Sequence, residues 1–187
     1  MNQEELDIIL ENHGKWLLNE GGERADLSNA DLKNTNLRFA NLRLADLRGA
    51  YLSYANFRGV DLRFADLSYA NLRFADLSYA NLSNADLSNV NLSNANFRGV
   101  DLSDANLNWV NWQHVEGLTV ICVQVDTTRK NNQIAYIKEL DIWITGCFQG
   151  TLDELKASVE QTHKHNEKLK KRYYRVIDFI LNEVEEE

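Results

Sequence analysis

Residues 25–44 read ADLSN ADLKN TNLRF ANLRL, and this five-residue pattern continues to residue 109. The first position is alanine, valine or threonine, and the third is leucine or phenylalanine. On an α-helix, leucines five apart would advance by about 140° and spread around the axis. On a flat strand, odd spacing would put alternate leucines on opposite faces. The chain must therefore turn after every unit and wind around its own leucines as a solenoid.

The third-position side chains form the expected solenoid core. They are Leu27, Leu32, Leu37, Leu42, Leu47, Leu52, Phe57, Leu62, Leu67, Leu72, Leu77, Leu82, Leu87, Leu92, Phe97, Leu102 and Leu107. An eighteenth unit at 110–114 strains the pattern, and the large apolar residue is gone at Gly117.

The pattern A(D/N)LXX resembles the pentapeptide repeat family. Its second position is Asp or Asn in every clean unit except the one with Tyr51. The resemblance implies a mainly β fold, a right-handed quadrilateral β-helix with four units per coil and the third-position side chain inside. The sequence FRGVDL recurs at 57–62 and 97–102, a shift of 40 residues that agrees with two coils of 20 residues each.

The two ends of a solenoid need covers. Residues 1–24 are expected to be an N-terminal capping helix, because apolar residues recur at helical spacing over 3–19 and Gly21 and Gly22 follow. Residues 25–117 are expected to form the β-helix. Residues 118–187 are expected to form a small α+β domain.

The expected α+β domain begins with two or three strands in 118–125 and 133–148, separated by a polar turn at 126–132. Thr151 and Glu154 then have the spacing of a capping box at the start of a helix. A second helix follows at about 167–185, with a wide apolar stripe that predicts dimerisation.

Side chains 20 residues apart should stack on one face at about 4.8 Å. One face then carries stacked carboxylates, the opposite face carries arginines, and the fifth position of several units carries an outward aromatic ring. The candidate interaction residues are Asp26, Asp46, Asp66, Asp86, Arg38, Arg58, Arg98, Tyr54 and Phe74. The alternative is that these charges are only solvated or bonded to backbone, and that the rings cover neighbouring backbone.

Composition limits the function. The net charge of −8 argues against direct binding to nucleic acid or to anionic lipid. An acidic N-terminus without a signal peptide, no apolar run of membrane length and only two cysteines predict a cytoplasmic protein without disulfides. The repeats place one kind of side chain at each stacked position, whereas a catalytic site needs several different side chains that converge on one point. We expect a noncatalytic scaffold without cofactor or metal, which binds a protein partner and is a possible homodimer through its C-terminal region.

Two other functions compete with the scaffold. The family resemblance implies a DNA mimic that acts on an enzyme such as a type II topoisomerase. However, about 22 Å of DNA carries roughly thirteen charges, and the acidic face offers only four aspartates. The third hypothesis is a small enzyme or metal site in the C-terminal domain, built from Cys122, Cys147, His163 and His165, or from Cys147 with His163 and Asp153. Their spacing matches no zinc signature.

Overall fold

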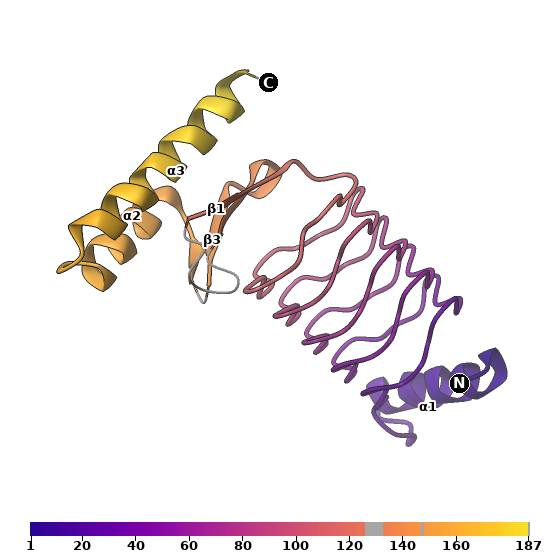
Figure 1. Ribbon diagram of the computed structural model, residues 1–187. Coiled ribbons are helices and arrows are strands. Elements are labelled where there is room, and N and C mark those ends of the chain that lie inside the picture. Colours follow the sequence, from indigo (N-terminus) through magenta and orange to yellow (C-terminus); the bar gives the residue numbers. More distant parts are fainter. Residues whose placement is uncertain (126–132, 147, 187) are drawn as a thin grey trace. The chain divides into compact units, whose positions relative to one another are not determined.

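The computed structural model describes residues 1–125, 133–146 and 148–186. The chain divides into two compact units, Met1–Gly117 and Leu118–Glu187 (Figure 1). The polar turn expected at 126–132 and the side chain of Cys147 lie outside the described residues.

The first unit contains a β-helix, and Figure 1 shows its coils stacked one on the next. Parallel bridges join residues 20 apart, from Asp26 with Asp46 through to Asn96 with Glu116. The amide of Leu62 donates to the carbonyl oxygen of Asn81 at 2.8 Å, and the amide of Asn81 donates to Val60 at 2.9 Å. Each coil therefore contains four pentapeptides and is hydrogen-bonded to its neighbours.

The third-position side chains fill the inside of the coils, and all of them are at most 1% exposed. Burying one leucine stabilises the fold by about 1.5–3 kcal/mol. The eighteenth unit, expected to strain the pattern, is regular: Trp112 is buried and lies edge-on to the Phe97 ring with a centroid distance of 6.3 Å. An indole thus takes the place of the leucine, and the coil continues to Glu116.

The fifth residue of each unit makes the corner. Its φ lies between 55° and 68° from Asn29 to His114, which is the left-handed region. The amide of the next residue closes the turn. Ala30, which follows Asn29, donates to the carbonyl oxygen of Leu27 at 3.1 Å. Left-handed backbone costs an ordinary L-residue about 1–2 kcal/mol and costs glycine little. Even so, Phe39 and Tyr69 adopt it, so the neighbouring coils hold them there.

The second position of every unit except the one with Tyr51 is Asp or Asn because its side chain binds the backbone. Oδ1 of Asp66 accepts the amide of Ser68 at 2.9 Å, and Oδ1 of Asn56 accepts the amide of Arg58 at 3.1 Å. Such a turn needs a short side chain with an acceptor oxygen and does not need a charge. The same bond recurs around the coil and explains why Asp and Asn alternate freely there.

Helix α1 (Gln3–Leu17) covers the first coil. Asn2 and Glu5 form a capping box at its start. Leu6 and His13 are its buried residues. The amide of Ala25 donates to Nδ1 of His13 at 3.0 Å, and Nε2 lies 3.0 Å from the carbonyl oxygen of Arg43. Because an amide only donates and a carbonyl only accepts, the ring is neutral with its proton on Nε2.

The second unit is an antiparallel sheet with two helices. In chain order its elements are β1 (Val120–Gln124), β2 (Gln133–Ile137), the 3-10 turn η1 (Lys138–Leu140), β3 (Ile142–Thr145), β4 (Phe148–Gly150), α2 (Leu152–Thr162) and α3 (Glu167–Glu186). The described strands lie in the order β1-β2-β3-β4. The expectation of two or three strands was wrong, because η1 and the turn at Gly146 divide residues 133–150 into three strands, which follow β1. The predicted capping box of Thr151 and Glu154 is confirmed.

The core of the second unit lies between the sheet and its helices. Tyr136 and Trp143 pair across β2 and β3, with ring centroids 4.7 Å apart. They pack with Leu155 of α2 and with Ile177 and Ile180 of α3. The apolar stripe of α3 is therefore used within its own unit, and it gives no reason to expect dimerisation through that stripe.

The bond from second-position side chain to backbone is testable at Asp66. In Asp66→Asn the amide oxygen still accepts from Ser68, so we expect a change in unfolding free energy within about 0.5 kcal/mol. In Asp66→Ala the acceptor is lost, which should cost about 1 kcal/mol more. Both variants lose the same charge, so the difference isolates the bond. Equal stabilities in urea unfolding would contradict this explanation.

The buried His13 predicts a pH dependence. Burial lowers its pKa below the ordinary value, and the nearby charge of Arg24 lowers it further. The unfolded chain therefore binds the proton more readily. The contribution of the neutral His13 ring to the unfolding free energy should be fully present above about pH 6.5. It should be lost as the pH falls from there through the lower pKa of the folded state. Thermal unfolding between about pH 7.5 and 5.5 measures this slope.

The His13→Leu variant should be less stable at neutral pH and should have a flatter slope than the wild type. His114→Asn is the matched control, because His114 is exposed. If His13→Leu keeps the slope of the wild type, His13 is not the group that titrates.

Candidate interaction surfaces

The acidic ladder consists of Asp26, Asp46, Asp66 and Asp86, which pair one above the other along the coils. Arg48 is bound to it: its Nε donates to Oδ1 of Asp46 at 2.8 Å and lies 3.8 Å from Oδ2 of Asp66. Arg24 approaches Asp46 to 3.8 Å. Two arginines therefore compensate part of the negative charge.

The expectation of four outward carboxylates was wrong for Asp46, which is only 4% exposed. The side-chain hydrogen bond from Arg48 holds the pKa of Asp46 below its ordinary value. All four carboxylates also accept the backbone amide two residues on. The carboxylates of the acidic ladder therefore stabilise the backbone of their own units. The sequence analysis gave this role only as the alternative to an interaction surface.

The basic face carries Arg38, Arg58 and Arg98, all exposed, with Ser78 buried between the last two. Arg58 extends toward the next coil, where Nη1 lies 3.4 Å from Oγ of Ser78 and the guanidinium lies 4.9 Å from the centroid of the Tyr79 ring. None of the three guanidinium groups forms an ion pair with a described residue. The basic face carries Asp76 as well, so three arginines stand against one carboxylate there, whereas Arg24 and Arg48 offset part of the charge of the acidic ladder.

Aromatic rings border the basic face at both corners. Tyr54 and Phe74 stack at one corner, with centroids 4.8 Å apart and planes inclined by 5°. Phe39 and Tyr79 lie at the other corner, and the guanidinium of Arg38 lies 5.2 Å from the Phe39 centroid. All four rings are large and exposed. Arginine beside exposed aromatic rings is the composition of protein interaction hot spots.

Glycines on the next coil make room for two of these rings. A Cβ added to Gly59 would lie 2.6 Å from the Phe39 ring, and one added to Gly99 would lie 2.9 Å from the Tyr79 ring. The rings therefore lie on bare backbone. This contact confirms that aromatic side chains cover neighbouring backbone, yet they remain exposed on their outer side.

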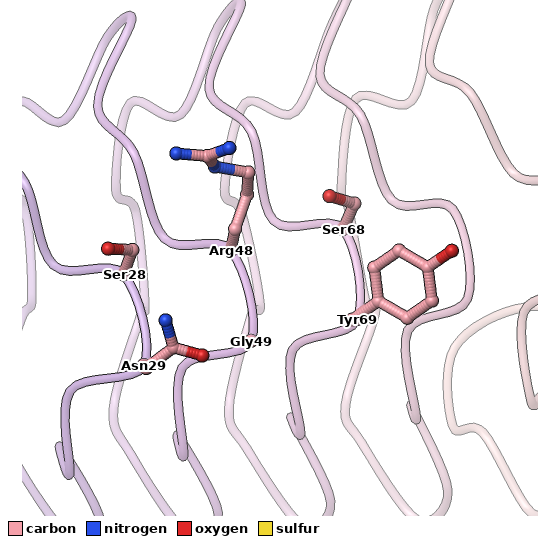
Figure 2. Close-up of a pocket in the computed structure, with 6 residues that line it drawn as sticks. All are labelled: Ser28, Asn29, Arg48, Gly49, Ser68 and Tyr69. Atoms are coloured by element: carbon pink, nitrogen blue, oxygen red, sulfur yellow. The ribbon is translucent and has the colours of Figure 1, made fainter.

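A hollow of about 550 Å³ lies at another corner, beside the acidic ladder. It is lined by Ser28, Asn29, Arg48, Gly49, Ser68 and Tyr69. Figure 2 shows Asn29 and Tyr69 on the coils either side of Gly49, and a Cβ added to Gly49 would lie 2.6 Å from Oδ1 of Asn29. Its lining has hydroxyl, amide and guanidinium groups but no carboxylate or histidine to act as a base. The hollow is suited to recognition and not to acid–base chemistry.

The third hypothesis placed a catalytic or metal site in the C-terminal unit, at Cys122, His163 and nearby residues. Cys122 is exposed on β1, because Ile121 and Val123 face the helices and Cys122 alternates to the other side. His163 stacks on Tyr173 with a centroid distance of 5.1 Å. Among the described residues, no group of three or more His, Cys, Asp or Glu side chains is placed to hold a metal ion.

The repeat geometry has a counterpart among known families. The model of the family described as pentapeptide repeats matches in eight copies, over residues 25–63, 45–78, 55–94, 65–104 and 80–111. The repeat region belongs to the pentapeptide repeat family. The matched segments run from the first unit of the coil to the eighteenth, so the pentapeptide repeats and the observed 20-residue bridges cover the same part of the chain.

Solved structures of pentapeptide repeat proteins resemble this chain. One is from the thylakoid lumen of Arabidopsis thaliana, with 36% identity over 49% of this chain and a TM-score of 0.48. Another is from the cyanobacterium Cyanothece 51142, with 37% identity over 49% of this chain and a TM-score of 0.48. The matches cover 63% of each of those two chains, less than two thirds of their length.

A third structure is HetL of Nostoc sp. strain PCC 7120, a pentapeptide repeat protein involved in regulation of heterocyst differentiation. It has 41% identity over 46% of this chain and 44% of its own, with a TM-score of 0.26. No curated protein matches this chain. In the described part of this pentapeptide repeat protein, no helix combines the length and the apolar character that a membrane crossing requires.

Two features of the first unit were missed by sequence reasoning, one in the pentapeptide repeats and one in helix α1. The left-handed fifth position was signalled by the residues Asn and Gly that occur there in many units. His13 had no comparable signal, because a lone histidine in a helix is most often solvated. Only the coil against which α1 packs shows that both ring nitrogens are bonded.

The contact between ring and glycine can be tested at Gly59. Gly59→Ala should lower the unfolding free energy by about 2–4 kcal/mol, because it adds both a close contact with Phe39 and left-handed strain. In a Phe39→Ala background the contact is absent, and the same change should cost about 1–2 kcal/mol. Equal costs in both backgrounds, measured by chemical unfolding, would show that the ring does not rest on Gly59.

Proposed function

We propose that this protein is a noncatalytic scaffold and that its basic face binds an acidic segment of another protein. The observation that carries the proposal is the set of three exposed, unpaired arginines between two aromatic corners. Arginine binds carboxylates in a fixed fork geometry, and aromatic rings supply apolar contact at little entropic cost. A protein with exposed Asp or Glu beside apolar side chains fits both.

The repeat geometry gives the basic face a regular spacing. In this proposal the coil is the right-handed quadrilateral form that the family resemblance implies. Neighbouring coils are about 4.8 Å apart, so Arg38 and Arg98 are separated by about 14 Å along the axis. An extended peptide advances about 3.3 Å per residue and spans this distance with about four to five residues. The face therefore suits a short acidic segment that lies along the axis.

The coil also holds the face rigid before a partner binds. The backbone beneath it is bonded to the coils above and below, and Arg58 rests on Ser78 and Tyr79. Side chains already fixed in position lose less conformational entropy on binding. This favours a binding surface over a catalytic site, because Oδ1 of Asp76, the carboxylate between Arg58 and Arg98, already accepts from the amide of Ser78 and from Nδ2 of Asn96.

A DNA mimic would use the acidic ladder instead. That ladder has a buried member in Asp46 and is compensated by Arg24 and Arg48. Its remaining charge is still further below the roughly thirteen charges of an equal length of DNA. The structure of this face thus supports the scaffold over the mimic.

The experiment that tests the proposal compares two baits in affinity purification from the native host. The first replaces Arg38, Arg58 and Arg98 with Gln, and the second replaces Asp26, Asp46, Asp66 and Asp86 with Asn. The Asn variant keeps the acceptor for each backbone amide and is the matched control for a change of charge. Thermal unfolding of both baits first establishes that they fold.

We expect the Arg→Gln bait to capture at least about tenfold less partner than the wild type, since charged hydrogen bonds contribute about 1.5–3 kcal/mol each. The Asp→Asn bait should capture as much as the wild type. If instead the Asp→Asn bait loses its partner, and only the wild type alters supercoiling by DNA gyrase, the protein acts as a DNA mimic and the scaffold proposal is wrong.

A further inference from the structure

Helix α3 has a second face, opposite the stripe that packs on the sheet. Lys168, Lys171, Arg175, Phe179 and Glu183 are exposed and fall within an arc of about 120° at 100° per residue. We name these five residues the outer stripe. Its aromatic member, Phe179, is 49% exposed although α3 lies against a sheet with its other side.

The charges of the outer stripe are sorted along the helix. The first half carries the cations Lys168, Lys171 and Arg175, and the second half carries the anion Glu183. This order opposes the helix dipole, which favours anions near the N-terminus and cations near the C-terminus. None of these four side chains forms an ion pair with a described residue. The helix itself therefore gains nothing from the arrangement.

The sorted charges are complementary to the same helix running in the opposite direction. Lys171 and Glu183 are each six residues from Ile177, and Arg175 and Phe179 are each two residues from it. In an antiparallel pair crossing at residue 177, Lys171 faces Glu183 of the partner subunit, and Arg175 faces Phe179 of the partner subunit. Two-fold symmetry makes each contact twice. A parallel pair would instead place like charges opposite each other.

We propose that the outer stripe of α3 binds the outer stripe of a second copy of this chain, antiparallel and centred on Ile177. The two Lys–Glu pairs set the direction, and the two cation–π contacts bury Phe179 at the centre. This is the helix in which the sequence predicts dimerisation, but the face is the opposite one. The inference is independent of the basic face on the β-helix.

The size of the contact determines its strength. The 20 residues of α3 span about 30 Å, and one helix pair buries less than the roughly 1,200 Å² at the lower limit of standard interfaces. The dimer is therefore weak and salt-dependent, with a dissociation constant on the order of 10–100 µM.

Sedimentation equilibrium of the full chain tests the proposal, at protein concentrations up to about 200 µM in about 25 mM salt. We expect a monomer–dimer equilibrium that shifts to monomer in about 1 M salt. Lys171→Glu and Glu183→Lys should each raise the dissociation constant about tenfold or more, because each creates two like-charge contacts. Phe179→Ala should weaken the dimer by a similar factor. Glu4→Lys on α1 is the control for a charge change elsewhere and should leave the constant unchanged.

The direction of the pair has its own test. The double variant Lys171→Glu with Glu183→Lys restores both pairs in the antiparallel dimer and should regain the wild-type constant. An equal mixture of the two single variants should also dimerise, because each heterodimer then contains two complementary pairs. A chain that stays monomeric at low salt, or single variants that dimerise like the wild type, would overturn the proposal. Failure of both the double variant and the mixture would overturn the antiparallel register.

Discussion

The left-handed corner at every fifth residue is the constraint on which the β-helix depends. With that corner, 20 residues return the backbone to a position directly beneath its own continuation, and parallel bridges can form. The corner also decides what the fifth side chain can do, because it projects outward next to the coil below. Asn and Gly adopt this conformation at low cost, whereas Phe and Tyr need support. The rings of Phe39 and Tyr79 find it on the bare backbone of Gly59 and Gly99.

Much of the repeat region could be predicted because its period is incompatible with helices and flat strands. The interior followed directly from the third position, and Trp112 differs from expectation only because an indole can replace a leucine inside the coil. The charged faces were harder to predict. A sequence shows that Asp46 stacks with Asp66, but it does not show that Arg48 folds over Asp46 and removes it from solvent. The exposure of Asp46 depends on how the Arg48 side chain lies within the same pentapeptide unit.

The second unit shows a different limit. The capping box of Thr151 and Glu154 was visible because it is local. The division of residues 133–150 into three strands depends on a short 3-10 turn that carries little sequence signal. The apolar stripe of α3 could equally have covered a sheet or a second subunit, and only the packing with Trp143 distinguishes the two. Once that stripe is occupied, the outer stripe becomes the surface of interest.

The basic face, the aromatic corners and the acidic ladder all take their positions from a coil that closes after 20 residues. Nuclear magnetic resonance couplings across hydrogen bonds test this closure most directly, because they identify the donor and the acceptor of each bond. The structure predicts a coupling from the amide nitrogen of Leu62 to the carbonyl carbon of Asn81, and one from Asn81 to Val60. Couplings from these amides to residues at any other separation would contradict the coil and the faces built on it.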